Sequence, residues 1–255
     1  WPAIKHRCYR DHRGASATVT AMIGGHRVFR TWSRAVDAYI ALTQFAREKF
    51  IAGGLPANRV HVKPNFLVQD PEPGISIRSG ALFVGRLSRE KGILELVEAW
   101  GNLPMPMTLT VMGDGPLEEE IRSRASDHDT IRMLGKQDKD AVLEGMRKAA
   151  FLVFPSTWYE GFPMTLLECF ATECPVIVPG FGGMAELVDD QSTGLHYRPL
   201  DANDLLRAIT WAISHPEEMV EFGRAARRNY LENYTLAKNY DAMMAIYETA
   251  GKPRA

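Results

Sequence analysis

The chain has 255 residues, of which 45% are hydrophobic and 24% charged, so it has the composition of an ordinary globular protein with one large domain, or one domain and part of another. Its formal net charge of -1 argues against a dedicated nucleic-acid-binding protein, because such proteins usually carry a strong basic excess. The three cysteines, Cys8, Cys169 and Cys174, are too few for a disulfide framework and suit a reducing compartment, so we expect a cytoplasmic protein.

Positive charge is concentrated at the start of the chain. Residues 1–34 contain a single acid, Asp11, against seven cations: Lys5, Arg7, Arg10, Arg13, Arg27, Arg30 and Arg34. Such a segment could face anionic lipid or a phosphorylated acceptor, or it could be an ordinary solvated helix face. No apolar run of about 18 residues is present, so any membrane contact is expected to be peripheral, on the inner face of the membrane. The chain starts at Trp1 with no targeting pattern, so we expect a fragment of a longer protein.

The first 75 residues predict part of an α/β domain. Residues 15–38 are helix-prone, although Gly24-Gly25 is expected to break or bend the helix. Thr43 can cap a following helix. The expected elements after residue 37 are a strand over 38–42, a helix over 44–52 and a strand over 60–62. Residues 68–80 are rich in proline and glycine and are interpreted as an interdomain linker, so we place the domain boundary between residues 75 and 76.

From residue 76 onward, short apolar strands alternate with helices. The expected strands cover residues 81–84, 109–112, 131–134, 151–154, 176–178 and 195–197, and the helices cover 92–103, 116–125, 139–149, 163–171, 184–188 and 204–215. A last helical stretch over 217–250 should wrap the outside of this domain. The alternation predicts an α/β fold with a Rossmann-like parallel sheet and helices on both faces. Ligands are therefore expected at the carboxyl ends of the strands.

Two glycine-containing turns follow the first two of these strands. In the first, Gly85 lets the backbone approach a ligand, Arg86 and Lys91 supply two cations, and Gly92 starts a helix whose amino end attracts anions. This arrangement suits a diphosphate, although an ordinary charged surface turn would explain the same residues about equally well. The second turn, over residues 113–116, is explained by turn chemistry and is interpreted as structural.

The strongest signal is the strand-to-helix turn over residues 155–168. Its loop carries Glu160, and the helix that follows should present free backbone N–H groups over residues 162–165, which can hold phosphate or sugar oxygens. Glu168 lies further along the same helix among apolar side chains, where a carboxylate needs a partner such as the hydroxyls of a ribose. The alternative is that both acids are ordinary helix charges. A further glycine-rich turn over 179–186 could approach the ligand from the other side, and Glu186 could equally be a charge at a helix start.

The spacing of Glu160 and Glu168 resembles the glutamate-x7-glutamate signature of the retaining glycosyltransferases of family 4, also called group 1. The remaining segments that look like this family are 84–87, 91–92, 113–116, 154–156, 160–164 and 175–177. The resemblance covers residues 81–248 closely and residues 35–66 more loosely. It implies a GT-B fold, in which two Rossmann-like domains face each other. Residues 76–255 would then be the C-terminal, nucleotide-sugar-binding domain, and residues 1–75 the remnant of the acceptor-side domain.

The resemblance also implies roles for individual residues. Arg86 and Lys91 would bind the donor diphosphate, Glu168 the ribose, and Glu160 would be the catalytic residue beside the donor sugar. The donor-binding set that it implies is Gly85, Arg86, Lys91, Gly135, Lys136, Gly161, Phe162, Pro163, Met164, Thr165, Leu166 and Glu168, with Gly135 and Lys136 near the base. No metal or cofactor is expected, because Arg86 and Lys91 can neutralise the diphosphate.

The expected function is therefore transfer of a sugar, with retention, from a nucleotide-diphosphate-sugar to a glycan or lipid-linked acceptor. None of His6, His12 and His26 matches the histidine that the family usually carries beside the donor sugar, so this chain alone is expected to bind the donor without transferring it. Two alternatives stay open: a non-catalytic nucleotide-sugar-binding module and a GT-B sugar-nucleotide epimerase. A nicotinamide dehydrogenase is disfavoured, because no Gly-x-Gly-x-x-Gly follows the first strand of the large domain.

Overall fold

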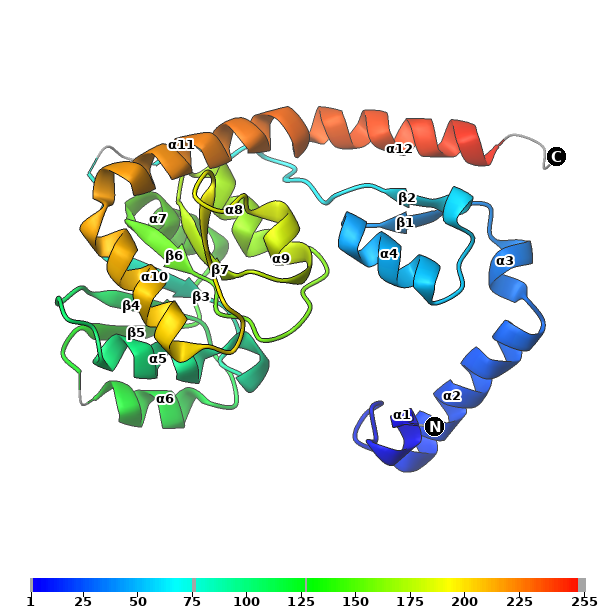
Figure 1. The fold of residues 1–255 in the computed structure, drawn as a ribbon, viewed down its shortest axis with the longest axis horizontal. Helices are drawn as coiled ribbons and strands as arrows, with labels where there is room; N and C mark the ends of the chain where they lie inside the picture. The colour runs from blue at the N-terminus through cyan, green and yellow to red at the C-terminus, as the bar shows by residue number, and fades with distance from the viewer. Residues whose placement is uncertain (1, 75–76, 127, 252–255) are drawn as a thin grey trace.

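The larger part of the molecule is built on one parallel sheet (Figure 1). A computed structural model describes residues 2–74, 77–126 and 128–251. The strands are β3 (Ala81–Val84), β4 (Leu109–Met112), β5 (Ile131–Gly135), β6 (Phe151–Val153), β7 (Val176–Pro179) and β8 (Gly194–Tyr197). Their spatial order is β5-β4-β3-β6-β7-β8, and every neighbouring pair is parallel. The predicted Rossmann-like sheet is confirmed.

Helices cover both faces of this sheet because its strands are apolar on both sides. Alternate residues of a strand point to opposite faces, so Phe83 joins one hydrophobic cluster and Leu82 the other. The first cluster is covered by α5 (Ile93–Gly101), α6 (Glu118–Ala125) and α10 (Ala202–Ser214). The second is covered by α7 (Lys139–Lys148), α8 (Met164–Ala171), α9 (Gly182–Leu187) and α11 (Pro216–Asn233). Two short 3-10 turns, η1 (Ala57–Arg59) and η2 (Arg89–Lys91), were not predicted.

The amino-terminal segment forms a separate small α/β unit. Its elements are α1 (Pro2–Lys5), α2 (Arg13–Val28), α3 (Thr31–Ala35), β1 (Tyr39–Ala41), α4 (Gln44–Ala52) and β2 (Val60–Val62), and β1 pairs with β2 in parallel. The capping prediction is confirmed, since the Ala46 N–H donates to the Thr43 hydroxyl over 3.0 Å. The predicted break at Gly24-Gly25 is wrong, because α2 is helical through both glycines. The turn comes later, at Arg30, whose φ of 51° is left-handed.

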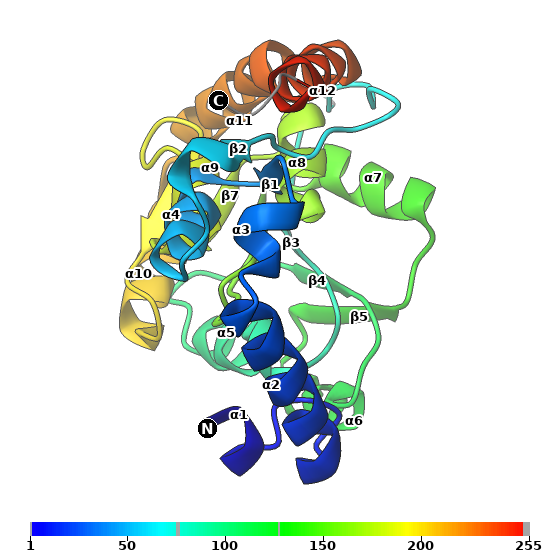
Figure 2. The same cartoon turned by 90° about the vertical axis from the view of Figure 1, so that its right-hand side faces the viewer.

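The carboxyl-terminal helical stretch divides into two helices with different neighbours. α11 packs on the large domain as predicted, but the helix ends at Asn233, and α12 (Leu236–Ala250) begins with Thr235 as its N-cap. α12 then runs alongside the amino-terminal unit (Figures 1 and 2). Asn239 on α12 donates to the Pro64 carbonyl over 2.7 Å and accepts from Lys63 Nζ over 3.1 Å. The expectation that the whole stretch wraps one domain is therefore wrong for α12.

The linker is fastened to the large domain by arginine side chains. Arg227 on α11 donates to Asp70 Oδ2 over 2.8 Å and to the Ala171 carbonyl over 2.6 Å, and Arg147 donates to the Glu72 carbonyl over 3.2 Å. The predicted boundary between residues 75 and 76 lies outside the described residues. Within the described part of the chain, no helix is both long enough and apolar enough to cross a membrane.

The loops after β3 and β6 touch each other because these two strands are neighbours. Gly92, between η2 and α5, has a φ of 67°, and a Cβ placed there would lie 2.0 Å from the Pro155 carbonyl oxygen. The Thr157 N–H also donates to the Glu90 carbonyl over 3.0 Å. Gly92 is thus required both for its left-handed backbone and for the close approach of the two loops.

Replacing Gly92 with alanine should lower the free energy of unfolding by about 3 kcal/mol, because the added Cβ meets a backbone carbonyl in a strained conformation. Gly161→Ala is the matched control: its Cβ has no neighbour within 4 Å, and the change should stay within about 0.5 kcal/mol. Urea unfolding of both variants measures the difference, and equal losses would contradict this packing role.

Candidate functional site

Two adjoining cavities lie at the carboxyl edge of the sheet, where β3 and β6 end. The smaller, of about 290 Å³, lies between the loops that follow these strands. The larger, of about 840 Å³, extends toward the ends of β4 and β5. Both are lined by Val84, Gly85 and Arg86, so they form one continuous site. Chain connections diverge to opposite sides between β3 and β6, which is where open α/β sheets bind ligands.

Most of the residues predicted from sequence line this site. Those in the smaller cavity are Gly85, Arg86, Lys91, Glu160, Phe162, Pro163, Met164 and Thr165, and Lys136 joins Gly85 and Arg86 in the larger one. Gly135, Gly161, Leu166 and Glu168 are not among the lining residues. The Leu166 side chain is fully buried, and its backbone N–H donates to the Pro163 carbonyl over 3.1 Å. Neither the side chain nor the N–H of Leu166 therefore faces the cavity.

Three polar side chains are bonded together in the smaller cavity. Lys91 Nζ lies 2.6 Å from Glu160 Oε1, and the Ser156 hydroxyl donates to the same oxygen over 2.8 Å. Lys91 also lies 5.7 Å from the centre of the Phe154 ring, in a cation-π contact. Arg86 is exposed at the junction of the two cavities. The cations predicted for a diphosphate therefore lie beside the predicted catalytic acid.

Helix α8 directs its amino end into the smaller cavity. Pro163 is its N-cap and supplies no side-chain hydrogen bond, and the first-turn residues Met164 and Thr165 line the cavity. First-turn N–H groups have no acceptor within their own helix, and the helix dipole adds partial positive charge there. This helix end can therefore bind phosphate or sugar oxygens.

Glu168 lies in the second turn of α8, facing α7. Burial raises the pKa of its carboxyl group, and the charge of Lys139 at the start of α7 opposes that shift. Among residues 2–74, 77–126 and 128–251, no hydrogen-bond donor reaches this carboxylate. A half-buried acid without a donor can accept hydroxyl groups from a ligand.

The glycines of the other two turns pack loops against each other. A Cβ on Gly113 would lie 1.9 Å from the Gly85 carbonyl oxygen, so this glycine is needed for loop packing, but residues 113–116 also line the larger cavity, and their structural interpretation stays a prediction. At Gly183, a Cβ would lie 3.0 Å from the Glu160 carbonyl oxygen. The turn over residues 179–186 thus supports the loop that carries Glu160.

Two contacts escaped the sequence analysis. The Glu186 carboxylate accepts the N–H groups of Gln44 and Phe45 over 2.6 and 2.7 Å, so it caps α4 of the amino-terminal unit. The Ser156 hydroxyl holds Glu160 and also lies 3.1 Å from the Glu90 carbonyl oxygen. A serine four residues before a candidate catalytic acid could have been noticed. The pairing of Glu186 with residues some 140 positions away could not.

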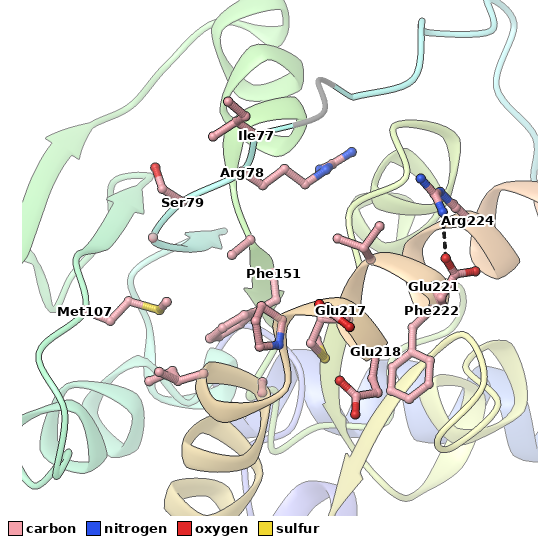
Figure 3. Close-up of a pocket in the computed structure, with 17 residues that line it drawn as sticks. Ile77, Arg78, Ser79, Met107, Phe151, Glu217, Glu218, Glu221, Phe222 and Arg224 are labelled. Atoms are coloured by element: carbon pink, nitrogen blue, oxygen red, sulfur yellow. Dashed lines mark hydrogen bonds and ion pairs between the residues drawn. The ribbon is translucent and has the colours of Figure 1, made fainter.

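A further cavity, of about 1020 Å³, lies at the opposite, amino edge of the sheet (Figure 3). It is largely apolar, and Glu217, Glu218 and Glu221 from α11 lie around it. Its Arg78 is engaged with backbone carbonyls, including that of Thr172 over 2.7 Å. Arg224 is paired with Glu221 over 2.6 Å, so three acids and two occupied arginines do not suit a diphosphate. In the part of the chain that the structure describes, no three His, Cys, Asp or Glu side chains group closely enough to hold a metal ion.

The strand order, with its connections diverging between β3 and β6, defines a Rossmann-like α/β domain with a cation-lined cavity at that point. The family model for glycosyl transferases group 1 matches residues 78–229, and the chain belongs to this family.

Curated relatives carry related names. The chain is 29% identical over 175 residues to a glycogen synthase of Mycobacterium tuberculosis, covering 66% of this chain and 42% of that protein. It is 26% identical over 240 residues to alpha-D-kanosaminyltransferase of Streptomyces kanamyceticus, covering 86% of this chain and 62% of that protein. The chain therefore spans about half the length of such relatives.

Solved structures share the fold. Anabaena HepE in complex with UDP and glucose matches with a TM-score of 0.75 at 18% identity, over 84% of this chain and 64% of that one. A Staphylococcus aureus TarM variant in complex with UDP, fondaparinux and alpha-GlcNAc-glycerol matches with a TM-score of 0.74 at 17% identity, over 84% and 44% of the two chains. The predicted fold class, that of GT-B glycosyltransferases, is confirmed.

The environment of Glu168 predicts how stability depends on pH. Its pKa is higher in the folded than in the unfolded chain. At pH values above the usual glutamate pKa, ionisation of Glu168 therefore lowers the free energy of unfolding, and protonation at lower pH removes that cost. Glu168→Gln should raise the free energy of unfolding at pH 7 by about 0.5 kcal/mol, a value reduced by partial solvation, and the gain should vanish near pH 4.

Urea unfolding at several pH values measures this gain. Glu173→Gln, just beyond the same helix, is the control and should change little. A Glu168→Gln variant less stable than the wild type at pH 7 would show that the carboxylate is well solvated or paired.

Proposed function

We propose that this chain is the donor-binding part of a retaining glycosyltransferase of family 4, which transfers a sugar from a nucleotide-diphosphate-sugar to a glycan or lipid-linked acceptor. One observation carries the proposal: Arg86, Lys91, Glu160 and the amino end of α8 line one cavity. Two cations and a helix dipole suit a diphosphate, and a carboxylate beside them suits the hydroxyls of the attached sugar.

In this proposal the protein groups stabilise the leaving diphosphate. Negative charge grows on the diphosphate as the sugar-phosphate bond loosens, and fixed positive groups stabilise that charge. Arg86, Lys91 and the N–H groups of Met164 and Thr165 would supply them, so we propose that neither a metal nor a cofactor is required. Glu160 would lie beside the donor sugar, where its charge can favour a cationic sugar in the transition state.

The nucleoside would lie along the larger cavity. Lys136 lines this cavity, and Gly135 is the preceding residue in the chain, so we assign these two residues to the neighbourhood of the base. Glu168 on α8 would accept the ribose hydroxyls. The similar structures of HepE in complex with UDP-glucose and of TarM in complex with UDP support a nucleotide-sugar as ligand.

A donor-binding module without transfer activity is the second candidate for this chain. None of the described residues that line the two cavities precedes Phe83, so the amino-terminal unit, as far as it is described, adds no side chain to them. We therefore propose that residues 1–75 belong to an acceptor-side domain whose reactive groups are not among them. Measuring sugar transfer and hydrolysis by this chain separates the candidates: activity would exclude the module.

Calorimetric titration with UDP, GDP, ADP and their glucose esters tests the site. Arg86→Ala should weaken binding of the best nucleotide about tenfold or more, because it removes a charge-assisted contact to phosphate. Arg89→Ala, an exposed arginine on the same loop that lines neither cavity, is the control and should change affinity less than about threefold.

The assignment of Glu168 to the ribose can be tested by changing the ligand. Glu168→Gln should weaken binding of the ribonucleotide about tenfold but hardly affect its dideoxy analogue, since only the former offers ribose hydroxyls. If Glu168→Gln weakens binding of both ligands equally, or of neither, the assignment of Glu168 to the ribose is refuted.

We also propose that the basic amino-terminal segment contacts an anionic membrane surface, with the protein on the cytoplasmic face. The segment projects from the rest of the chain (Figure 1), and Val28 and Phe29 at the end of α2 are 79% and 74% exposed beside Arg27 and Arg30. Exposed apolar side chains next to cations suit a lipid interface.

Sedimentation with phosphatidylcholine vesicles, with and without phosphatidylglycerol, tests this contact. Arg27→Glu with Arg30→Glu should reduce binding to anionic vesicles at least tenfold, at about 1 kcal/mol per cation. Arg122→Glu with Arg124→Glu on α6 is the control with the same charge change. Equal losses in both variants, or binding that is insensitive to salt, would contradict the assignment.

A further inference from the structure

Glu160 is held through one of its two carboxylate oxygens. Oε1 accepts from Lys91 Nζ over 2.6 Å and from the Ser156 hydroxyl over 2.8 Å. No donor among the described residues reaches Oε2. The side chain is 17% exposed and lines the smaller cavity, so its free acceptor capacity can be met by a ligand that brings hydroxyl groups.

The two donors that hold Glu160 can be satisfied without it when a diphosphate is bound. A hydroxyl has one proton, and the Ser156 hydroxyl lies 3.1 Å from the Glu90 carbonyl oxygen, so it stays satisfied if Glu160 turns away. Lys91 has three protons and faces the cavity assigned to the diphosphate, and the Phe154 ring supports its ammonium group. Neither Ser156 nor Lys91 is therefore left unpaired when Glu160 turns toward a ligand, and only Glu160 itself needs new donors.

We propose that Glu160 and the donor diphosphate compete for Lys91, so that the ion pair distinguishes a sugar nucleotide from the free nucleoside diphosphate. This inference rests on the proposed function. A diphosphate that takes Lys91 leaves the Glu160 carboxylate beside a second anion, which is unfavourable. The sugar of an intact donor supplies hydroxyl groups to that carboxylate and offsets the repulsion. The free diphosphate has none, so it binds less tightly and leaves more readily after transfer.

Glu160→Gln tests the competition, because glutamine keeps the shape and removes the charge. Titrations use the nucleotide among UDP, GDP and ADP that binds the wild type best, and its glucose ester. The variant should bind the free nucleoside diphosphate about threefold to tenfold more tightly, as expected for loss of a partly exposed ion pair. It should bind the glucose ester no more tightly than the wild type, so the preference for the sugar nucleotide falls.

Two further variants isolate the role of Lys91. In a Lys91→Met background, Glu160→Gln should change diphosphate affinity less than about twofold, since there is no ammonium group left to release. Glu90→Gln is the control for charge, because it removes one negative charge from the same loop, where the Ser88 hydroxyl donates to the Glu90 carboxylate over 2.7 Å. It should also change diphosphate affinity less than about twofold. Thermal unfolding confirms that each variant is folded.

The outcomes separate the two proposals. If the wild type binds a nucleotide through Arg86 but Glu160→Gln weakens or leaves unchanged the affinity for the diphosphate, the competition is refuted and the proposed function stands. Equal tightening with and without Lys91, or equal tightening by Glu90→Gln, would reduce the effect to general electrostatics and refute it as well. If no nucleotide binds the wild type, both proposals fall.

Discussion

The site depends on the side-by-side placement of β3 and β6 in the parallel sheet. The chain leaves β3 toward β4 on one side and leaves β6 toward β7 on the other, so the loops after these two strands face each other. Gly92 lets them approach, because any larger residue would collide with the Pro155 carbonyl. Through this contact Lys91, from one loop, reaches Glu160, from the other. Residues some 70 positions apart thus become one charged group.

The sheet was predictable because its strands carry a local signal. A strand buried on both faces is a short apolar run, and β3 and β4 begin and end where those runs do. Helices that lack a local signal were harder. The two glycines in α2 cost helix stability without ending the helix. The start of α12 carries a local signal, the N-cap Thr235, but the contact of α12 with the amino-terminal unit is made by Asn239 and Pro64. Such contacts join distant parts of the chain, which no local pattern reveals.

The site was predictable to the extent that chemistry follows strand ends. Arg86, Lys91 and Glu160 stand out as charges in loops after apolar strands, and they line one cavity. Leu166 was included because it follows the same motif, yet helix periodicity turns it into the core. Glu168, two residues later on α8, is left half-buried and unpaired, and its ionisation works against folding. A sequence motif records neither which face a residue occupies nor which oxygen of a carboxylate is already bonded.

The loop that carries Glu160 is also where the amino-terminal unit meets the large domain. Tyr159 lies between Phe45 of α4 and Phe181 before α9, with ring centres 5.1 and 5.2 Å away. Glu186 caps α4 from the other side, and Gly183 packs against both the Glu160 carbonyl and Thr43. A shift of α4 relative to α9 would break the Glu186 cap and expose two N–H groups, and a shift of α4 would also alter the ring contact of Tyr159, the residue next to Glu160. The smaller unit therefore contacts the loop that carries the carboxylate, although its described residues contribute no side chain to the cavity itself.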